Sequence, residues 1–183
     1  MVKRLVPLLV IAIVSAALDL LIKSFFNYLP PAPKTSLIPG VIEISPQLNT
    51  GIIWGLFSDT NVILLVAIPL LAIPMIIAVF LLTQKAAIKT NPSGKLDWLI
   101  ICALGLILGG AIGNIYDRIF YHGVRDFIHY YYLIDWPTFN IADAYISAGA
   151  VLMIISLFRK EKESIITDKP AVESATDIAE KTN

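Results

Sequence analysis

Two aspartates, Asp126 and Asp143, are the residues of this sequence best suited to chemistry. Asp126 lies in the stretch 123–127, and Asp143 comes directly before fifteen uncharged residues, 144–158. A carboxylate in or beside a lipid bilayer costs roughly 2.5–3.5 kcal/mol on insertion scales, so it normally has a partner or a function. The two aspartates flank one short segment and could meet across it. A meeting pair can share one proton, so that one carboxyl group acts as a base and the other as an acid in hydrolysis.

The composition indicates that these aspartates belong to a membrane protein. The chain has 183 residues, of which 57% are hydrophobic and 15% are charged, and its mean hydropathy is +0.76. An ordinary soluble domain has about 25% charged residues. The net charge is zero, so nucleic acid is not expected as a partner. The single cysteine, Cys102, has no partner in the chain for a disulfide.

Four segments have the length of about 20 residues that a bilayer requires. They run over about 5–26, 62–82, 98–116 and 139–158. Asp19 and Lys23 stand in the first segment where a cleaved signal peptide would carry small residues. We therefore expect this segment to be retained as a helix.

Basic residues predict how these segments cross the membrane. Most of them gather at one set of segment ends: Lys3, Arg4, Lys85, Lys89, Lys95, Arg159, Lys160 and Lys162. The opposite set carries Lys34, Arg118 and Arg125. The positive-inside rule then predicts cytoplasmic termini and two outer segments, about 27–61 and 117–138. We expect residues 1–160 to form one four-helix membrane domain and the charged tail 161–183 to be disordered in the cytoplasm.

With this orientation, the polar residues of the helices fall at one level, the outer interface. Asp19 and Lys23 are spaced i and i+4, as are Asn114 and Arg118, so each pair shares a helix face. Asn140 lies three positions before Asp143 and can point at the same cleft. Asp126 follows in the outer segment between the last two helices. One level of polar groups favours a single site over scattered helix-end charges.

The outer segment and one helix also carry structural patterns. Residues 36–45 predict short strands around a turn at Pro39 and Gly40. Residues 51–57 are too short to span a membrane and predict an amphipathic piece on its surface. Three glycines at intervals of four form a ridge on which another helix can pack closely: Gly105, Gly109 and Gly113.

Taken in order, these motifs resemble those of the lipoprotein signal peptidases, the type II signal peptidase family of bacteria. The matching pieces are Asp19 with Lys23, Asn-Thr-Gly at 49–51, the run 109–118, Val-Arg-Asp-Phe at 124–127, and Phe-Asn-Ile-Ala-Asp at 139–143. The resemblance extends over about residues 3–158. The sequence departs from the family in two places. Arg125 stands where an apolar residue is more usual, and Ile-Ile-Trp at 52–54 replaces a smaller stretch that contains alanine.

The resemblance implies a fold, a reaction and a set of site residues. The fold is an all-α polytopic membrane protein with four transmembrane helices, a small extracytoplasmic β-cradle and a short surface helix. The reaction is removal of the signal peptide from bacterial prolipoproteins, with the cut before a cysteine that carries diacylglyceryl. Asp126 and Asp143 match the catalytic pair. The positions that match supporting or substrate-binding residues are Asn49, Gly51, Asn114, Arg118, Asn140, Asp19 and Lys23.

The resemblance also implies partners and a location. The expected partners are the lipidated prolipoprotein and membrane lipid, with no cofactor and no metal, and the protein is expected to be a monomer. It is expected in the bacterial cytoplasmic (inner) membrane, with the active site at the extracytoplasmic interface.

Two other functions are compatible with a small membrane protein of this composition. A proton-coupled or ion-coupled transporter would use buried carboxylates as relays. It would place them near the middle of the membrane and would often show an internal repeat, and the sequence has neither pattern. A purely structural adaptor leaves the paired aspartates unexplained.

Individual residues also have simpler interpretations. Asp143 could cap the last helix or pair with Arg118, and Asp126 could be a solvated loop charge. Asp19 and Lys23 are expected to form a structural ion pair. His122 and His129 lie near several aspartates, but a spacing of seven residues fits no compact metal-binding motif.

Overall fold

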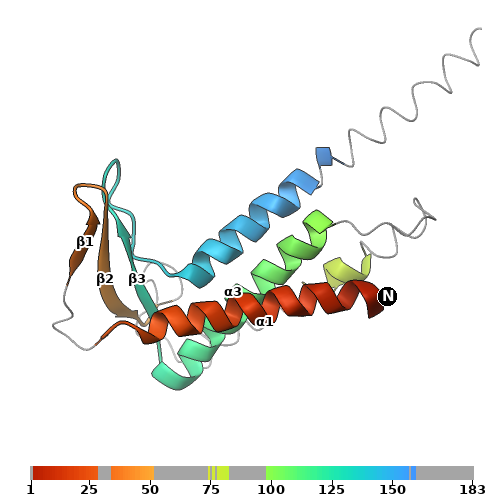
Figure 1. Cartoon of the computed structure of the whole chain (residues 1–183), viewed down its shortest axis with the longest axis horizontal. Coiled ribbons are helices and arrows are strands. Elements are labelled where there is room, and N and C mark those ends of the chain that lie inside the picture. Colours follow the sequence, from red (N-terminus) through yellow and green to blue (C-terminus); the bar gives the residue numbers. More distant parts are fainter. Residues whose placement is uncertain are drawn as a thin grey trace, which may run out of the picture.

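The computed structural model describes residues 2–28, 34–51, 74, 76, 78–82, 98–156 and 158–159. Its labelled elements are α1 (Val2–Ser24), β1 (Thr35–Ile38), β2 (Ile42–Asn49), α3 (Trp98–Tyr121) and β3 (Val124–Tyr130). A further apolar helix, Ile141–Ser156, follows β3. The small sheet lies at one end of the helices, at the end of α1 opposite the N-terminus (Figure 1).

The three strands form an antiparallel sheet in the order β1-β2-β3. The predicted strands around Pro39 and Gly40 are confirmed, and Gly40 has a positive φ of 78°, which glycine adopts without strain. Asp126 lies on β3 opposite Gln47 of β2. Asp126 thus lies within the predicted outer segment, about 117–138, and the structure adds a third strand there, which joins the predicted hairpin.

Helix α1 packs closely against α3 through the glycine ridge. A Cβ atom added at Gly105 would lie 2.8 Å from the side chain of Ile11. One added at Gly109 would overlap Ser15, and one added at Gly113 would overlap the Asp19 carboxylate. The ridge therefore acts in packing, as the spacing predicted, and it also brings Asp19 against α3.

The apolar core lies along the inner faces of the helices. It is formed by a cluster of buried side chains: Leu8, Ile76, Phe80, Ile100, Ile101 and Leu104. Large apolar side chains are exposed on the outer faces, among them Val10 and Ile13 on α1 and Ile154 on the last helix. Exposed apolar side chains of this kind are expected where helices face lipid.

Two described helices, Leu5–Ser24 and Trp98–Tyr121, are long and apolar enough to cross a membrane. Helix α3 continues five residues beyond the predicted end at Tyr116, which places Asp117 and Arg118 within the helix. Most of the predicted span 62–82, the surface piece 51–57 beyond Gly51, and the tail 161–183 lie outside the described residues.

Candidate active site

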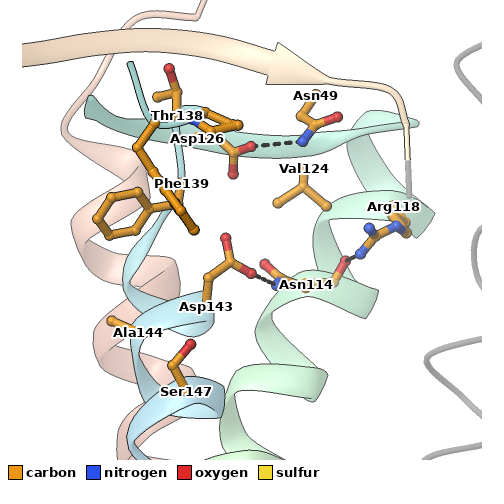
Figure 2. A pocket seen from close by; sticks show the side chains of 12 residues that line it. Asn49, Asn114, Arg118, Val124, Asp126, Thr138, Phe139, Asp143, Ala144 and Ser147 are labelled. Atoms are coloured by element: carbon orange, nitrogen blue, oxygen red, sulfur yellow. Dashed lines mark hydrogen bonds between the residues drawn. The ribbon is translucent and has the colours of Figure 1, made fainter. Parts of the chain in front are cut away.

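Asp126 and Asp143 line one cavity of about 430 Å³ between the sheet and the helices. Asp126 comes from β3, and Asp143 comes from the first turn of the helix Ile141–Ser156. Figure 2 shows both carboxyl groups pointing into this space, one from the strand and one from the helix. Asp126 is 1% exposed, whereas Asp143 is half-buried. The two aspartates therefore line the same cavity, as expected for residues that flank one short segment.

Asp143 is held by a reciprocal cap at the start of its helix. The backbone N–H of Asp143 donates to Asn140 Oδ1 at 3.0 Å, and the backbone N–H of Asn140 donates to Asp143 Oδ2 at 3.2 Å. This is the geometry of a capping box, which satisfies two otherwise free helix donors. Asp143 thus does cap the helix, as one simpler interpretation held. Its other oxygen, Oδ1, accepts a hydrogen bond from Asn114 Nδ2 at 2.8 Å and still faces the cavity.

Two amide side chains connect the aspartates. Asn140 Nδ2 donates to Asp126 Oδ1 at 2.6 Å and to Asn114 Oδ1 at 3.2 Å. Asn114 in turn donates to Asp143, which closes the connection between the strand and the helix. Asn140 is fully buried and Asn114 nearly so, so water does not compete for these bonds.

The end of β2 holds Asp126 from the other side. Asn49 Nδ2 donates to Asp126 Oδ2 at 3.0 Å, a bond drawn in Figure 2. Asn49 Oδ1 accepts a hydrogen bond from the backbone N–H of Gly51 at 3.0 Å. This contact fixes which end of the Asn49 amide faces Asp126, and it gives the Asn-Thr-Gly motif a physical role.

The pKa of the Asp126 carboxyl group is raised from 3.8 to about 7. Burial is the largest cause, and the negative charge of Asp143 is the second. The hydrogen bonds donated by Asn49 and Asn140 favour the ionised form and offset only part of this shift. Near neutral pH the buried carboxyl group can therefore hold a proton beside a second carboxyl group, as acid–base hydrolysis requires.

Arg118 lines the same cavity but makes few contacts. Its Nη1 donates to the backbone oxygen of Asn114 at 3.3 Å. Its Nε is buried, and none of the residues that the structure describes accepts a hydrogen bond from it. The expected alternative of an Asp143–Arg118 ion pair does not occur among the described ion pairs. Arg118 thus has donor capacity left at the cavity.

Asp19 and Lys23 lie behind the cavity and form the predicted ion pair at 2.8 Å. The Lys23 ammonium group also lies 3.0 Å from Asp117 and donates to Asn114 Oδ1 at 3.0 Å. Asn114 also donates to Asp143, so Lys23 contacts the side chain that holds one of the two aspartates. The nine predicted site residues therefore lie in one connected region.

Asp117 and Arg125 were not among the predicted site residues, yet both are buried beside the site. Arg125 donates to Asp117 Oδ1 from Nε at 3.0 Å and from Nη2 at 2.8 Å. The available signal was the position of Asp117, three residues after Asn114 and within an otherwise apolar helix. Arg125 was visible only as a departure from the family pattern.

The two histidines lie away from the aspartate pair. His129 sits between Glu43 at 3.0 Å and Asp135 at 2.6 Å on the sheet. These contacts raise the pKa of the His129 ring, with the hydrogen bond to Glu43 as the largest cause. His122 is exposed after the end of α3.

Comparisons with known proteins find one family of relatives. Residues 11–159 match the family model described as signal peptidase (SPase) II. The lipoprotein signal peptidase of Aquifex aeolicus (strain VF5) is 41% identical over 64% of this chain and 70% of its own length. That of Sulfurihydrogenibium sp. (strain YO3AOP1) is 32% identical over 87% of this chain and 96% of its own length. That of Pseudomonas aeruginosa (strain UCBPP-PA14) is 33% identical over 85% of this chain and 90% of its own length.

Solved structures share the fold. One, described as a bacterial membrane enzyme, aligns with a TM-score of 0.61 at 24% identity over 84% of this chain and 88% of its own length. A second with the same description aligns with a TM-score of 0.62 at 26% identity over 82% and 91%.

None of these relatives supports the transporter alternative. The matches extend over most of both sequences. Five of the residues that carry the resemblance line one cavity: Asn49, Asn114, Arg118, Asp126 and Asp143. The chain therefore belongs to the signal peptidase II family of bacterial membrane aspartic proteases.

Proposed function

We propose that this protein removes signal peptides from bacterial prolipoproteins, with Asp126 and Asp143 as its catalytic pair. The observation that carries the proposal is the shared cavity with one fully buried and one half-buried carboxyl group. Different environments push the pKa values of two nearby carboxyl groups apart, which gives an acid and a base. The family match supports the same reaction.

In this proposal Asp126 holds the shared proton and Asp143 is ionised. Asp143 takes a proton from a water molecule, whose oxygen attacks the scissile carbonyl carbon. Asp126 gives its proton to the carbonyl oxygen, which yields a neutral tetrahedral intermediate. The C–N bond then breaks as Asp143 returns a proton to the leaving amine, and Asp126 regains its proton from the hydroxyl group. One water molecule is consumed, and both aspartates return to their starting protonation states.

The other site residues position these groups. Asn49 and Asn140 hold Asp126, and Asn114 holds Asp143. Arg118 retains a buried donor at the cavity, so its role in the proposal is to hold a carbonyl group of the substrate.

The proposal includes the membrane arrangement. The chain crosses the inner membrane four times with both termini in the cytoplasm, and the cavity lies at the outer interface. The apolar signal peptide and the acyl chains of the modified cysteine then remain among helices and lipid, while the mature chain leaves towards the aqueous side. Cleavage occurs before the diacylglyceryl cysteine, and the enzyme acts as a monomer.

The test is cleavage of a prolipoprotein by the purified full-length protein in detergent. One substrate carries the diacylglyceryl group and a matched substrate lacks it. We expect release of the signal peptide from the lipidated substrate alone, and a mass measurement should place the cut before the modified cysteine. Equal cleavage of both substrates would contradict the proposed specificity, and cleavage of neither would contradict the function.

A further inference from the structure

Four charged side chains are buried directly behind the aspartate pair, and we call them the buried charge cluster: Asp19, Lys23, Asp117 and Arg125. The first three are 0% exposed and Arg125 is 6% exposed. Lys23 lies 2.8 Å from Asp19 and 3.0 Å from Asp117, and Arg125 lies 2.8 Å from Asp117. The two carboxylates and the two cations balance. Removing one partner would leave a costly uncompensated charge in the interior.

The buried charge cluster also binds the main chain next to each catalytic aspartate. Asp19 Oδ1 accepts a hydrogen bond from the backbone N–H of Ala142 at 2.9 Å. Asp117 Oδ2 accepts one from the backbone N–H of Arg125 at 3.0 Å. Ala142 and Arg125 immediately precede the two catalytic residues. Because Lys23 joins the two accepting carboxylates, one ammonium group links the segments that carry the pair.

Arg125 fixes the orientation of β3 relative to Asp117 of α3. Its Nε, Nη2 and backbone N–H all donate to the Asp117 carboxylate, so one residue occupies both oxygens. The guanidinium carbon lies 4.1 Å from the ring centre of Tyr121 and 5.9 Å from that of Tyr28. A planar fork beside aromatic rings has one favoured orientation, which a lysine cannot copy.

Neighbouring residues of a strand point to opposite faces. On β3, Asp126 lines the cavity, and Arg125 contacts Asp117 and Tyr121 of α3. A shift of the strand would therefore move both side chains together. We propose that Arg125 is a positioning residue, which locks β3 onto α3 through Asp117 and thereby sets how far Asp126 lies from Asp143. This inference rests on the proposed function.

The separation of the two aspartates can be read from the titration of Asp126. The charged and titratable groups that act on Asp126 come from every element around it: Asp143 from the last helix, Lys23 from α1, Tyr28 after α1, and Arg118 from α3. Among them, the negative charge of Asp143 raises the pKa of Asp126. A larger separation weakens this repulsion, so we expect that pKa to fall when β3 moves away from Asp143.

The test compares Arg125→Lys, Arg125→Met and the double variant Arg125→Met/Asp117→Asn in the full-length protein in detergent. Cleavage of the lipidated prolipoprotein at several pH values gives kcat and KM. The infrared carbonyl band of protonated Asp126, identified by its loss in Asp126→Asn, gives the pKa without substrate. In Arg125→Met we expect kcat to fall about 10-fold to 100-fold with KM changed less than about twofold, since misplacement by about 1 Å has such effects.

The same variant should titrate Asp126 at a lower pH than the wild type, and Arg125→Lys should lie between the two. The double variant separates positioning from charge balance. It restores a neutral cluster, so it should regain thermal stability while it keeps the lowered kcat and the lowered pKa. Recovery of the wild-type kcat and pKa in the double variant would overturn the proposal, because Arg125 would then serve only to balance charge.

Wild-type values of kcat and pKa in Arg125→Met would overturn it as well. If Arg125→Met does not fold, Arg125→Lys and the double variant give the same distinction. The infrared measurement needs no cleavage. A wild-type protein without cleavage activity would therefore contradict the proposed function, whereas an unchanged Asp126 band in the variants would contradict the positioning role.

Discussion

Asn140 contacts both members of the aspartate pair: its side-chain amide donates to Asp126 at 2.6 Å, and its backbone N–H donates to Asp143 at 3.2 Å. The residue also begins the last helix, so the same side chain serves folding and the site. These two roles can be separated by substitution.

Asn140→Ala should lower both stability and activity. Loss of the helix cap costs about 1 kcal/mol, and loss of the bond to Asp126 should lower kcat about 100-fold through misplacement. Asn140→Ser is the matched control, because serine caps a helix but is too short to reach Asp126. It should melt at a higher temperature than Asn140→Ala, because the cap is kept, and should still lose activity. Melting curves and cleavage rates on the same preparations decide this, and an active Asn140→Ser would refute the role of the amide.

Asp126→Asn and Asp143→Asn should each insert and fold but lose nearly all cleavage. Each removes one of the two groups that transfer protons in the proposed mechanism. The rate of signal-peptide release measures the loss, and substantial turnover by either variant would disprove the assignment. A strong chelator should leave the wild type active.

Activity should fall as the pH rises through about 7. The mechanism needs Asp126 in its protonated form, and the raised pKa keeps that form populated only below this pH. The measurement is kcat/KM as a function of pH, which reports on the free enzyme. A profile that stays flat up to pH 9 would place the proton on another group.

The same proton affects stability. Between pH 3.8 and about 7 the folded protein holds a proton on Asp126 that the unfolded chain releases. The contribution of Asp126 to the free energy of unfolding therefore decreases as the pH rises through this window. In Asp126→Asn this contribution disappears. As the pH rises from 3.8 to about 7, the melting temperature of the wild type should therefore fall relative to that of Asp126→Asn. Parallel curves of melting temperature against pH would contradict the shifted pKa.

Gly113→Ala should weaken the contact between α1 and α3. The new Cβ would overlap the Asp19 carboxylate, and such overpacking costs about 1–3 kcal/mol. Gly40→Ala is the control, because it strains a turn with φ of 78° but meets no atom within 4 Å. Both variants should have a lower melting temperature than the wild type. Only Gly113→Ala should also lower the kcat of the folded protein. Equal kcat values would show that Asp19 does not support the site.

Arg118→Lys should keep the charge and the fold but lower activity. Lysine lacks the planar set of donors that leaves Nε available at the cavity. We expect cleavage to fall about 10-fold to 100-fold through poorer positioning of the substrate, with an unchanged melting temperature. A fully active Arg118→Lys would show that only the charge matters.

Much of the site could be predicted from the sequence because its residues lie at helical spacings. Asn140 and Asp143 are separated by one turn, and the structure shows them joined in a capping box. Strand β3 could not be predicted in this way. Its first four residues, Val-Arg-Asp-Phe, place two charged residues side by side and so lack the alternation of polar and apolar residues that identifies a strand. In the structure all four are buried.

The sequence also could not predict which buried charged residues pair with one another. Asp117 and Arg125 read as helix-end and loop charges until the fold brings them together. Their contact depends on where β3 meets α3, and this is set by pairing with β2 far along the chain. Spacing within one helix carries no information about such a contact.

The hydrogen bond from Ala142 to Asp19 joins residues 123 positions apart, and this has a consequence for biosynthesis. The ribosome releases α1 first, and this helix carries Asp19 together with its i+4 partner Lys23. Asp143 becomes available only after nearly all of the membrane domain has been translated. A nascent chain that stops before the last helix therefore lacks Asp143, so under the proposed mechanism it has no proteolytic activity.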